Sequence, residues 1–253
     1  MKDNTRQAPY GVEPVILQLG EVSDESVGGK AYGLSRLTGM GLTVPPAFVI
    51  RGAQQGHYPT GLREAWEALG EHPVAVRSSA QGEDGADDSF AGQYDTVLNV
   101  EGYDALLAAI DQCVSSLDSE RAREYAGRQQ GDQTAMNIVV QRMVNARAAG
   151  VVFTADPVSA RRDVLVIDAV AGLGEALVSG EATPDHFALD RQNQVMHQSI
   201  AGDAAVLHGK ELASIAHEAR HAEAHAGQPL DLEWAIDQSG KIFWLQARPI
   251  TTL

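Results

Sequence analysis

Apolar and polar positions alternate along the chain in ways that predict its first strands and helices. After a polar amino-terminal arm, residues 14–19 ("PVILQL") form a short apolar run that is typical of a strand. Residues 25–41 ("ESVGGKAYGLSRLTGMG") have helical spacing instead, with an apolar stripe made of Ala31, Leu34, Leu37 and Met40. Gly39 and Gly41 predict the end of this helix, and the two prolines of residues 42–50 ("LTVPPAFVI") predict extended chain.

The same patterns continue to the carboxyl end. Strands are predicted at residues 73–79, 136–144, 148–158 and 163–170, and helices at residues 61–70, 103–117, 119–131 and 210–227. The second and third of these strands look like neighbours joined by a short "NARA" connection, and a loop rich in Gly, Asp and Ser occupies residues 80–96. Strands and helices interleave without a regular βαβ rhythm, so we expect a mixed α/β (α+β) fold.

Residues 231–237 ("DLEWAID") and 241–250 ("KIFWLQARPI") predict a closing hairpin with one polar face. A period of two puts Asp231 and Glu233 on one face of the first strand. The same period groups Ile242, Trp244, Gln246 and Arg248 in the second strand. Carboxylate and amide oxygens suit Mg²⁺, and a guanidinium suits phosphate oxygens. A solvent-facing hairpin with an Asp/Arg ion pair is the alternative.

Composition narrows the class of protein. The formal net charge is −15 over 253 residues, which argues against binding to nucleic acid, because a phosphate backbone requires a cationic face. Cys113 is the only cysteine, so no intramolecular disulfide can form, and its helical surroundings predict a buried structural thiol. The sequence has no apolar signal segment and no run of eighteen apolar residues, so we expect a cytoplasmic protein without membrane contact.

Three further segments contain residues suited to nucleotide chemistry. "GGK", ending at Lys30, begins the first helix, where backbone N–H groups favour anions; a glycine turn capping a surface helix is the alternative. Arg77 ends a strand before the Gly/Asp-rich loop, as in a phosphate clamp with a lid, unless it pairs with Glu83, Asp84, Asp87 or Asp88. "VVQRMV", with Gln141 and Met143, suits the edge of a flat base, although these residues alone favour a plain core strand.

Three histidines also share one stripe of the last predicted helix: His217, His221 and His225. A single straight stripe rarely surrounds one metal ion, so we interpret these residues as a partly exposed polar face.

In order along the chain, these segments resemble a known family. The blocks at residues 28–50, 74–100, 150–158, 172–187 and 230–251 are similar to the ATP-grasp nucleotide-binding domain of phosphoenolpyruvate synthase, pyruvate phosphate dikinase and rifampicin phosphotransferase. The resemblance implies an arm at residues 1–18 and an ATP-grasp domain at residues 19–253. Its subdomains would be residues 19–130 and 131–253, with ATP between them.

The resemblance also implies roles for individual residues. Lys30, Arg77 and Arg248 match the phosphate-binding, catalytic positions. Glu233 and Gln246 match the Mg²⁺-binding positions, and the remaining nucleotide-binding positions are Gly92, Thr96, Gln141, Met143, Glu175 and Asp231.

The reaction implied by the family cleaves ATP to AMP and phosphate. The phosphoryl group would pass to an unidentified small-molecule acceptor or to a phosphohistidine carrier protein in trans, because the swivelling carrier domain of the family is not expected in this chain. An ATP-grasp ligase that forms an acyl phosphate and ADP is one alternative. A non-catalytic ATP-binding module of a split complex is another.

Overall fold

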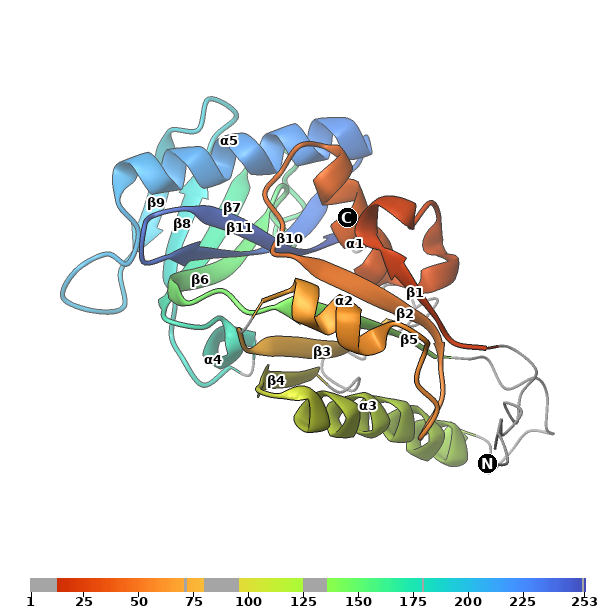
Figure 1. Ribbon diagram of the computed structural model, residues 1–253. Coiled ribbons are helices and arrows are strands. Elements are labelled where there is room, and N and C mark those ends of the chain that lie inside the picture. Colours follow the sequence, from red (N-terminus) through yellow and green to blue (C-terminus); the bar gives the residue numbers. More distant parts are fainter. Residues whose placement is uncertain (1–12, 71, 80–95, 125–135, 179, 252) are drawn as a thin grey trace, which may run out of the picture. The chain divides into compact units, whose positions relative to one another are not determined.

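The computed structural model describes residues 13–70, 72–79, 96–124, 136–178, 180–251 and 253. Within these residues the chain forms two compact units. Unit 1 contains residues 13–31, 46–70, 72–79, 96–124 and 136–143, and unit 2 contains residues 32–45, 144–178, 180–251 and 253. Each unit is built on one antiparallel sheet, and the two are described separately below (Figure 1).

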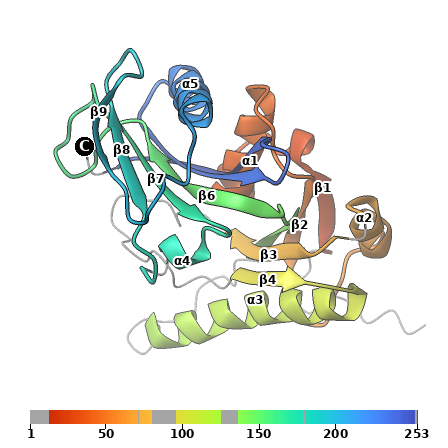
Figure 2. The ribbon, with the colours of Figure 1, turned by 90° about the vertical axis from the view of Figure 1, so that its left-hand side faces the viewer.

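Unit 1 is organised around a five-stranded sheet in the order β1-β2-β5-β3-β4. Its strands are β1 (Val15–Gln18), β2 (Ala47–Ala53), β3 (Val74–Ser79), β4 (Thr96–Val100) and β5 (Met136–Arg142). Two short 3-10 helices follow β1, namely η1 (Leu19–Glu21) and η2 (Glu25–Val27). The helices α2 (Leu62–Ala68) and α3 (Tyr103–Glu124) complete this unit, and α3 runs beside β3 and β4 (Figure 2).

One face of this sheet forms the apolar core of unit 1. Alternate residues of β2, β3 and β5 contact buried residues of α2 and α3, among them Phe48, Val76 and Ile138. Cys113 of α3 is completely buried in this core, and its Sγ donates to the Val76 carbonyl at 3.6 Å, which confirms the predicted structural thiol. The opposite face carries the polar residues discussed below.

Unit 2 has a six-stranded sheet in the order β11-β10-β6-β7-β8-β9. Its strands are β6 (Ala146–Phe153), β7 (Leu165–Ala171), β8 (Asp185–Leu189), β9 (Val195–Ser199), β10 (Leu230–Asp237) and β11 (Ile242–Pro249). The short α4 (Glu175–Val178) follows β7, and α5 (Gly209–Ala226) covers one face of the sheet (Figure 1). The core beneath α5 includes Trp234 and Trp244, both completely buried.

The helix α1 (Gly29–Gly39) begins in unit 1 and ends in unit 2. Three residues of its predicted apolar stripe, Ala31, Leu34 and Leu37, are at most 2% exposed. The helix ends at Gly39, as predicted, and Gly41 with φ +79° reverses the chain toward β2.

Two predictions about the strands are wrong. Segments 136–144 and 148–158 were expected to be neighbours, but β5 pairs with β2 and β3 in unit 1, whereas β6 pairs with β7 and β10 in unit 2. The predicted grouping of Trp244 with Gln246 and Arg248 also fails. A β-bulge makes Leu245 an extra residue, because Glu233 pairs with Gln246 while Trp234 pairs with Trp244.

Candidate functional site

The uncovered face of the unit 1 sheet brings several predicted site residues into register. Arg77 of β3 lies directly opposite Thr96 of β4, and Ala75, two residues earlier, lies opposite Gln141 of β5. Since directly paired residues share a sheet face, Arg77, Thr96 and Gln141 all lie on the face away from α2 and α3. Ser79 continues this face by one further step of the strand alternation.

A glycine and a serine place Lys30 beside the same face. Ser79 Oγ accepts a hydrogen bond from the Ala31 N–H at 3.1 Å and donates one to the Val27 carbonyl at 2.9 Å. Gly28 has φ +89° and ψ 157°, a conformation nearly restricted to glycine, and a Cβ there would lie 2.3 Å from the Ser79 carbonyl oxygen. The first turn of α1, with the half-buried Lys30, is therefore held against the end of the strand that carries Arg77.

Gln141 is buried within β5, whereas Met143 lies just after the strand. Gln141 is 2% exposed, lies between the small residues Ala47 and Ala75, and its Nε2 has no hydrogen-bond partner among the described residues. Met143 follows β5, where its N–H donates to the Pro73 carbonyl at 2.9 Å and its sulfur accepts from the Asn99 N–H at 3.0 Å. Buried amide groups usually have a hydrogen-bond partner, so the Nε2 of Gln141 is an exception on this face.

Four other predicted residues lie on the closing hairpin of unit 2, at the end away from its turn. Asp231 pairs with Arg248 across the strands, and Glu233 pairs with Gln246, so all four share one face. Arg248 Nε donates to Asp231 Oδ2 at 2.7 Å. The Asp231 side chain is 9% exposed and that of Arg248 is 40% exposed, so the guanidinium extends from a buried carboxylate toward solvent. The ion pair weighed in the sequence analysis is therefore present, and Glu233 lies beside it.

The donor set of this hairpin suits Mg²⁺. Glu233 is half-buried and Gln246 is 7% exposed, and together they present a carboxylate and an amide oxygen from adjacent strands. Mg²⁺ commonly takes one or two such protein ligands and completes its octahedron with water and substrate phosphates. The β-bulge at Leu245 separates this polar end from the apolar end, where Trp244 turns into the core.

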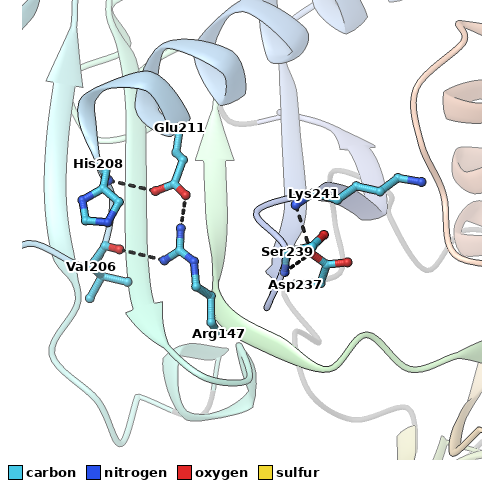
Figure 3. Close-up of polar contacts among 7 residues, drawn as sticks. All are labelled: Arg147, Val206, His208, Glu211, Asp237, Ser239 and Lys241. Atoms are coloured by element: carbon cyan, nitrogen blue, oxygen red, sulfur yellow. Dashed lines mark hydrogen bonds and ion pairs between the residues drawn. The ribbon is translucent and has the colours of Figure 1, made fainter.

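Hydrogen bonds fix the hairpin turn and the start of the neighbouring strand β6 (Figure 3). Asp237 Oδ1 accepts from the N–H groups of Ser239 and Lys241, at 2.9 and 3.0 Å, and from the Ser239 hydroxyl. Chiefly because of the Ser239 hydroxyl, these bonds lower the pKa of Asp237. At the start of β6, Arg147 forms an ion pair with Glu211 of α5.

The Arg147–Glu211 ion pair belongs to a wider network, which the sequence analysis did not predict. Arg147 Nη1 also donates to the Val206 carbonyl at 3.2 Å, and the second oxygen of Glu211 accepts from the His208 N–H at 2.9 Å (Figure 3). Burial by itself raises the pKa of Glu211, but the hydrogen bonds from Arg147 and His208 outweigh it and lower the pKa. The network ties the first residues of β6 to the start of α5.

Glu175 is related to the polar face of unit 2 only through its neighbours in the chain. Glu175 is exposed in the first turn of α4. A Cβ added to the preceding Gly174 would lie 3.5 Å from the Cβ of Ala149. Ala149 shares a sheet face with Ala235 and hence with Glu233, so α4 follows a segment at the edge of the polar face. Gly92 and the acids considered as partners of Arg77, which lie between residues 83 and 88, are outside the described residues.

A histidine–aspartate pair on this sheet was also missed. His186 of β8 lies opposite Asp168 of β7, and its Nδ1 is 2.7 Å from Asp168 Oδ1. The two residues are 18 positions apart, and no spacing rule links them before the strand register is known. The three histidines of α5, by contrast, are exposed, as the sequence analysis expected.

Lys30, Arg77, Thr96, Gln141 and Met143 therefore belong to unit 1, whereas Glu175, Asp231, Glu233, Gln246 and Arg248 belong to unit 2. Within each unit, the predicted residues gather on or beside one face of the sheet. None of the helices in the described part of the chain is long and apolar enough to span a membrane.

Comparison with known proteins identifies relatives for nearly the whole chain. The prodigiosin synthesizing transferase PigC of Serratia marcescens is 36% identical, over 89% of this chain and 32% of the relative. A probable phosphoenolpyruvate synthase of Methanocaldococcus jannaschii is 33% identical, over 94% of this chain and 27% of the relative. The rifampicin phosphotransferase of Bacillus subtilis is 40% identical, over 72% of this chain and 24% of the relative. The chain thus spans a third or less of each of these proteins.

Solved structures show the same fold at low sequence identity. An L-amino acid ligase from Bacillus licheniformis superposes with a TM-score of 0.51 at 13% identity, covering 89% of this chain and 43% of the ligase. D-alanyl-alanine synthetase A from Vibrio cholerae also gives a TM-score of 0.51, at 14% identity, covering 89% of this chain and 56% of the synthetase. Both comparisons identify the ATP-grasp fold.

The family model of the pyruvate phosphate dikinase AMP/ATP-binding domain matches residues 55–206 and 192–253. These matches include Arg77, Gln141 and the whole closing hairpin. The chain belongs to the family of pyruvate phosphate dikinase AMP/ATP-binding domains and has the ATP-grasp fold.

Proposed function

We propose that this chain binds ATP with Mg²⁺ and acts as the phosphoryl-donating part of a phosphotransferase. In this proposal ATP is cleaved to AMP and phosphate. The phosphoryl group passes to a small-molecule acceptor or to a phosphohistidine carrier protein. Membership of the AMP/ATP-binding domain family supports nucleotide binding, and the relatives named as phosphoenolpyruvate synthase and rifampicin phosphotransferase support the type of reaction.

The observation that carries the proposal is the polar end of the hairpin. Asp231 and Arg248 form an ion pair directly beside Glu233 and Gln246, on one face of two paired strands. Phosphoryl transfer depends on positioning and on neutralising the charge of phosphate oxygens, which requires cationic side chains and a divalent ion rather than a protein nucleophile. Rigid strands hold such groups more accurately than loops do.

The residues of unit 1 have matching roles in this proposal. Lys30 and Arg77 would neutralise the phosphates, and Thr96 lies beside Arg77 at the start of β4. Gln141 and Met143 would border the base, and Glu175 would lie at the edge of the site. When bound, Mg²⁺ would lower the negative charge of the phosphate oxygens, with Glu233 and Gln246 as its protein ligands.

Phosphorus NMR of the protein incubated with ATP and Mg²⁺ tests the reaction type, because it resolves AMP, ADP and inorganic phosphate. AMP with inorganic phosphate is the expected result. Formation of ADP alone would instead indicate the ligase-type reaction. Tight binding of ATP without turnover, with any acceptor, would indicate a binding module.

A variant pair tests the metal site. Glu233→Gln removes the metal-binding charge with little change of shape, so we expect activity to fall on the order of 100-fold or more and the Mg²⁺ dependence of ATP affinity to weaken. Glu64→Gln, on the exposed surface of α2, is the matched control and should leave both unchanged. Equal Mg²⁺ dependence in both variants, measured by calorimetry, would refute the assignment of Glu233.

A further inference from the structure

Two histidines of α5 lie one helical turn apart with their rings in contact. His221 and His225 are both exposed, and their ring centroids are 4.2 Å apart. Residues four apart on a helix are neighbours on its surface, and two histidines at this spacing can ligate one zinc ion. His217 lies one turn earlier on the same stripe, but the close ring contact within α5 is that of the later pair.

One nitrogen of each ring is held by a backbone carbonyl. His221 Nε2 is 3.2 Å from the Met40 carbonyl oxygen, and His225 Nδ1 is 3.0 Å from the His221 carbonyl oxygen. Because a carbonyl oxygen only accepts, each of these nitrogens carries a proton. A neutral ring then has its lone pair on the remaining nitrogen, which is Nδ1 of His221 and Nε2 of His225. Histidines that bind metals usually donate their second nitrogen to a carbonyl or carboxylate in this way.

The separation of the two rings suits bonds to a single ion. Metal–nitrogen bonds of about 2.1 Å, at angles between roughly 90° and 109°, place the two nitrogens about 3.0–3.4 Å apart. Ring centroids at 4.2 Å allow one nitrogen of each ring to reach this separation through small changes in side-chain torsion. The rings of His186 and His197, on β8 and β9, are further apart, at 6.2 Å. The pair on α5 is therefore the better chelate.

The surroundings of this pair favour a cation. His225 lies in the last turn of α5, and Met40 directly follows the end of α1 at Gly39. The carboxyl end of a helix carries partial negative charge, so the ends of both helices attract a positive ion. The formal net charge of −15 acts in the same direction.

We propose that His221 and His225 form a binding site for a divalent transition-metal ion such as Zn²⁺, Cu²⁺ or Ni²⁺. Imidazole nitrogen suits these ions, whereas Mg²⁺ prefers oxygen ligands. The described chain has no group of three or more histidine, cysteine or acidic side chains that could hold a metal ion, so water completes the coordination. This inference does not depend on the phosphotransfer proposed above.

The site is separate from the proposed Mg²⁺ site of the same unit. Trp234 packs in the core beneath α5, and its neighbour Glu233 points to the opposite face of the sheet. An ion bound to the two histidines cross-links the last two turns of α5, and the hydrogen bond of His221 extends this restraint to Met40. The metal therefore stabilises α5 and its contact with the end of α1.

The test uses the whole chain without an affinity tag, in the presence of Mg²⁺ and the absence of ATP. Mg²⁺ occupies sites with oxygen ligands, and omitting ATP prevents its phosphates from binding the probe, which is Zn²⁺. Imidazole nitrogen–proton NMR spectra follow each histidine, and calorimetry measures affinity. His225→Asn removes one ligand. His217→Asn is the matched control, because it is the same change at another exposed position of the same stripe.

We expect the ring signals of His221 and His225 to shift together along one binding curve, with protons retained on His221 Nε2 and His225 Nδ1. His225→Asn should weaken Zn²⁺ binding by at least about tenfold, whereas His217→Asn should match the native chain. Zn²⁺ at about ten times its Kd should raise the Tm of the native chain by roughly 3–6 °C, and this rise should be lost in His225→Asn.

The inference is overturned if neither ring or only one ring responds, if the two rings respond at different Zn²⁺ concentrations, or if His225→Asn binds as tightly as the native chain. Equal losses in His217→Asn and His225→Asn would also overturn it, because Zn²⁺ binding would then be a property of the whole stripe. Failure to bind or cleave ATP would concern the proposed function alone, so the two failures are distinguishable.

Discussion

Replacing Gly28 by alanine should destabilise unit 1 and displace the first turn of α1. Gly28 occupies a backbone region that is essentially restricted to glycine, with φ +89° and ψ 157°, and holding another residue there costs about 1–3 kcal/mol. The added Cβ would also lie 2.3 Å from the Ser79 carbonyl oxygen, which is backbone and can yield only if the end of β3 moves. We therefore expect a loss of about 3 kcal/mol, near the upper end of single-substitution effects.

Thermal and urea unfolding, followed by circular dichroism, measure this loss. A change of about 3 kcal/mol corresponds to a fall of roughly 6–12 °C in Tm for a chain of this size. Gly39→Ala is the control within the same helix, because a Cβ there meets nothing within 4 Å and Gly39 is not among the glycines of positive φ. It should be neutral, or stabilising by about 0.5–1 kcal/mol. Equal midpoints for the two variants would show that the contact between Gly28 and Ser79 does not constrain the fold.

Three further predictions concern polar contacts. Glu211→Gln should lower the free energy of unfolding by about 1–2 kcal/mol at pH 7, because it weakens the contact with Arg147. Since the pKa of Glu211 is lowered from 4.5, the native chain should be more stable than the variant above that pH, and the difference should shrink as the pH falls below it. Urea unfolding at several pH values measures this difference. Burial, and then the hydrogen bond to Asp111, raise the pKa of Tyr58 to about 12. Ultraviolet titration should therefore find a tyrosine that ionises about two pH units above the ordinary value, and this step should be absent in Tyr58→Phe. The stability linked to this hydroxyl is present below about pH 10 and is lost as the pH rises toward 12. Arg248→Met should lower phosphotransfer about 100-fold or more. Its stability loss should be about 1–3 kcal/mol, because the buried carboxylate of Asp231 loses a charged partner. Arg248→Lys should restore part of the rate, whereas a collapse of stability without a specific loss of rate would make the ion pair purely structural.

Local pattern predicted most of the elements, but it could not predict which strands pair. The apolar stripe of α1, the buried β3 and the closing hairpin follow from periodicities of about 3.6 and 2, which depend only on near neighbours in sequence. The separation of β5 from β6 into different sheets depends on partners far along the chain, such as Val139 with Arg77 and Val151 with Glu233. A short connection between two apolar segments carries no information about such partners.

The strands β4, β8 and β9 and one residue pair were not predicted. All five residues of β9 are exposed, so no alternation of apolar and polar positions marks it. β8 alternates buried and half-buried positions, but its five residues were assigned to no element. Asp168 and His186 meet only through the pairing of β7 with β8, so their contact required the register before it could be recognised.

Among the site residues, the hairpin pairs were predicted best. Asp231, Glu233, Gln246 and Arg248 alternate within two segments joined by a tight turn, and this geometry is nearly determined by sequence. The location of Lys30 beside the face of Arg77, in contrast, depends on the hydrogen bonds of Ser79. Those bonds join residues about fifty positions apart, and no local pattern indicates them.

The extra residue in β11 lets one strand serve both the interior and the polar end. With the same residues and no bulge, Leu245 would lie opposite Trp234 and Trp244 would lie opposite Ala235, so the indole of Trp244 would turn onto the face of Glu233. A cavity in the interior and an indole crowding the carboxylate would then arise together. One unpaired residue thus allows a large aromatic core and a polar end to share a single short hairpin.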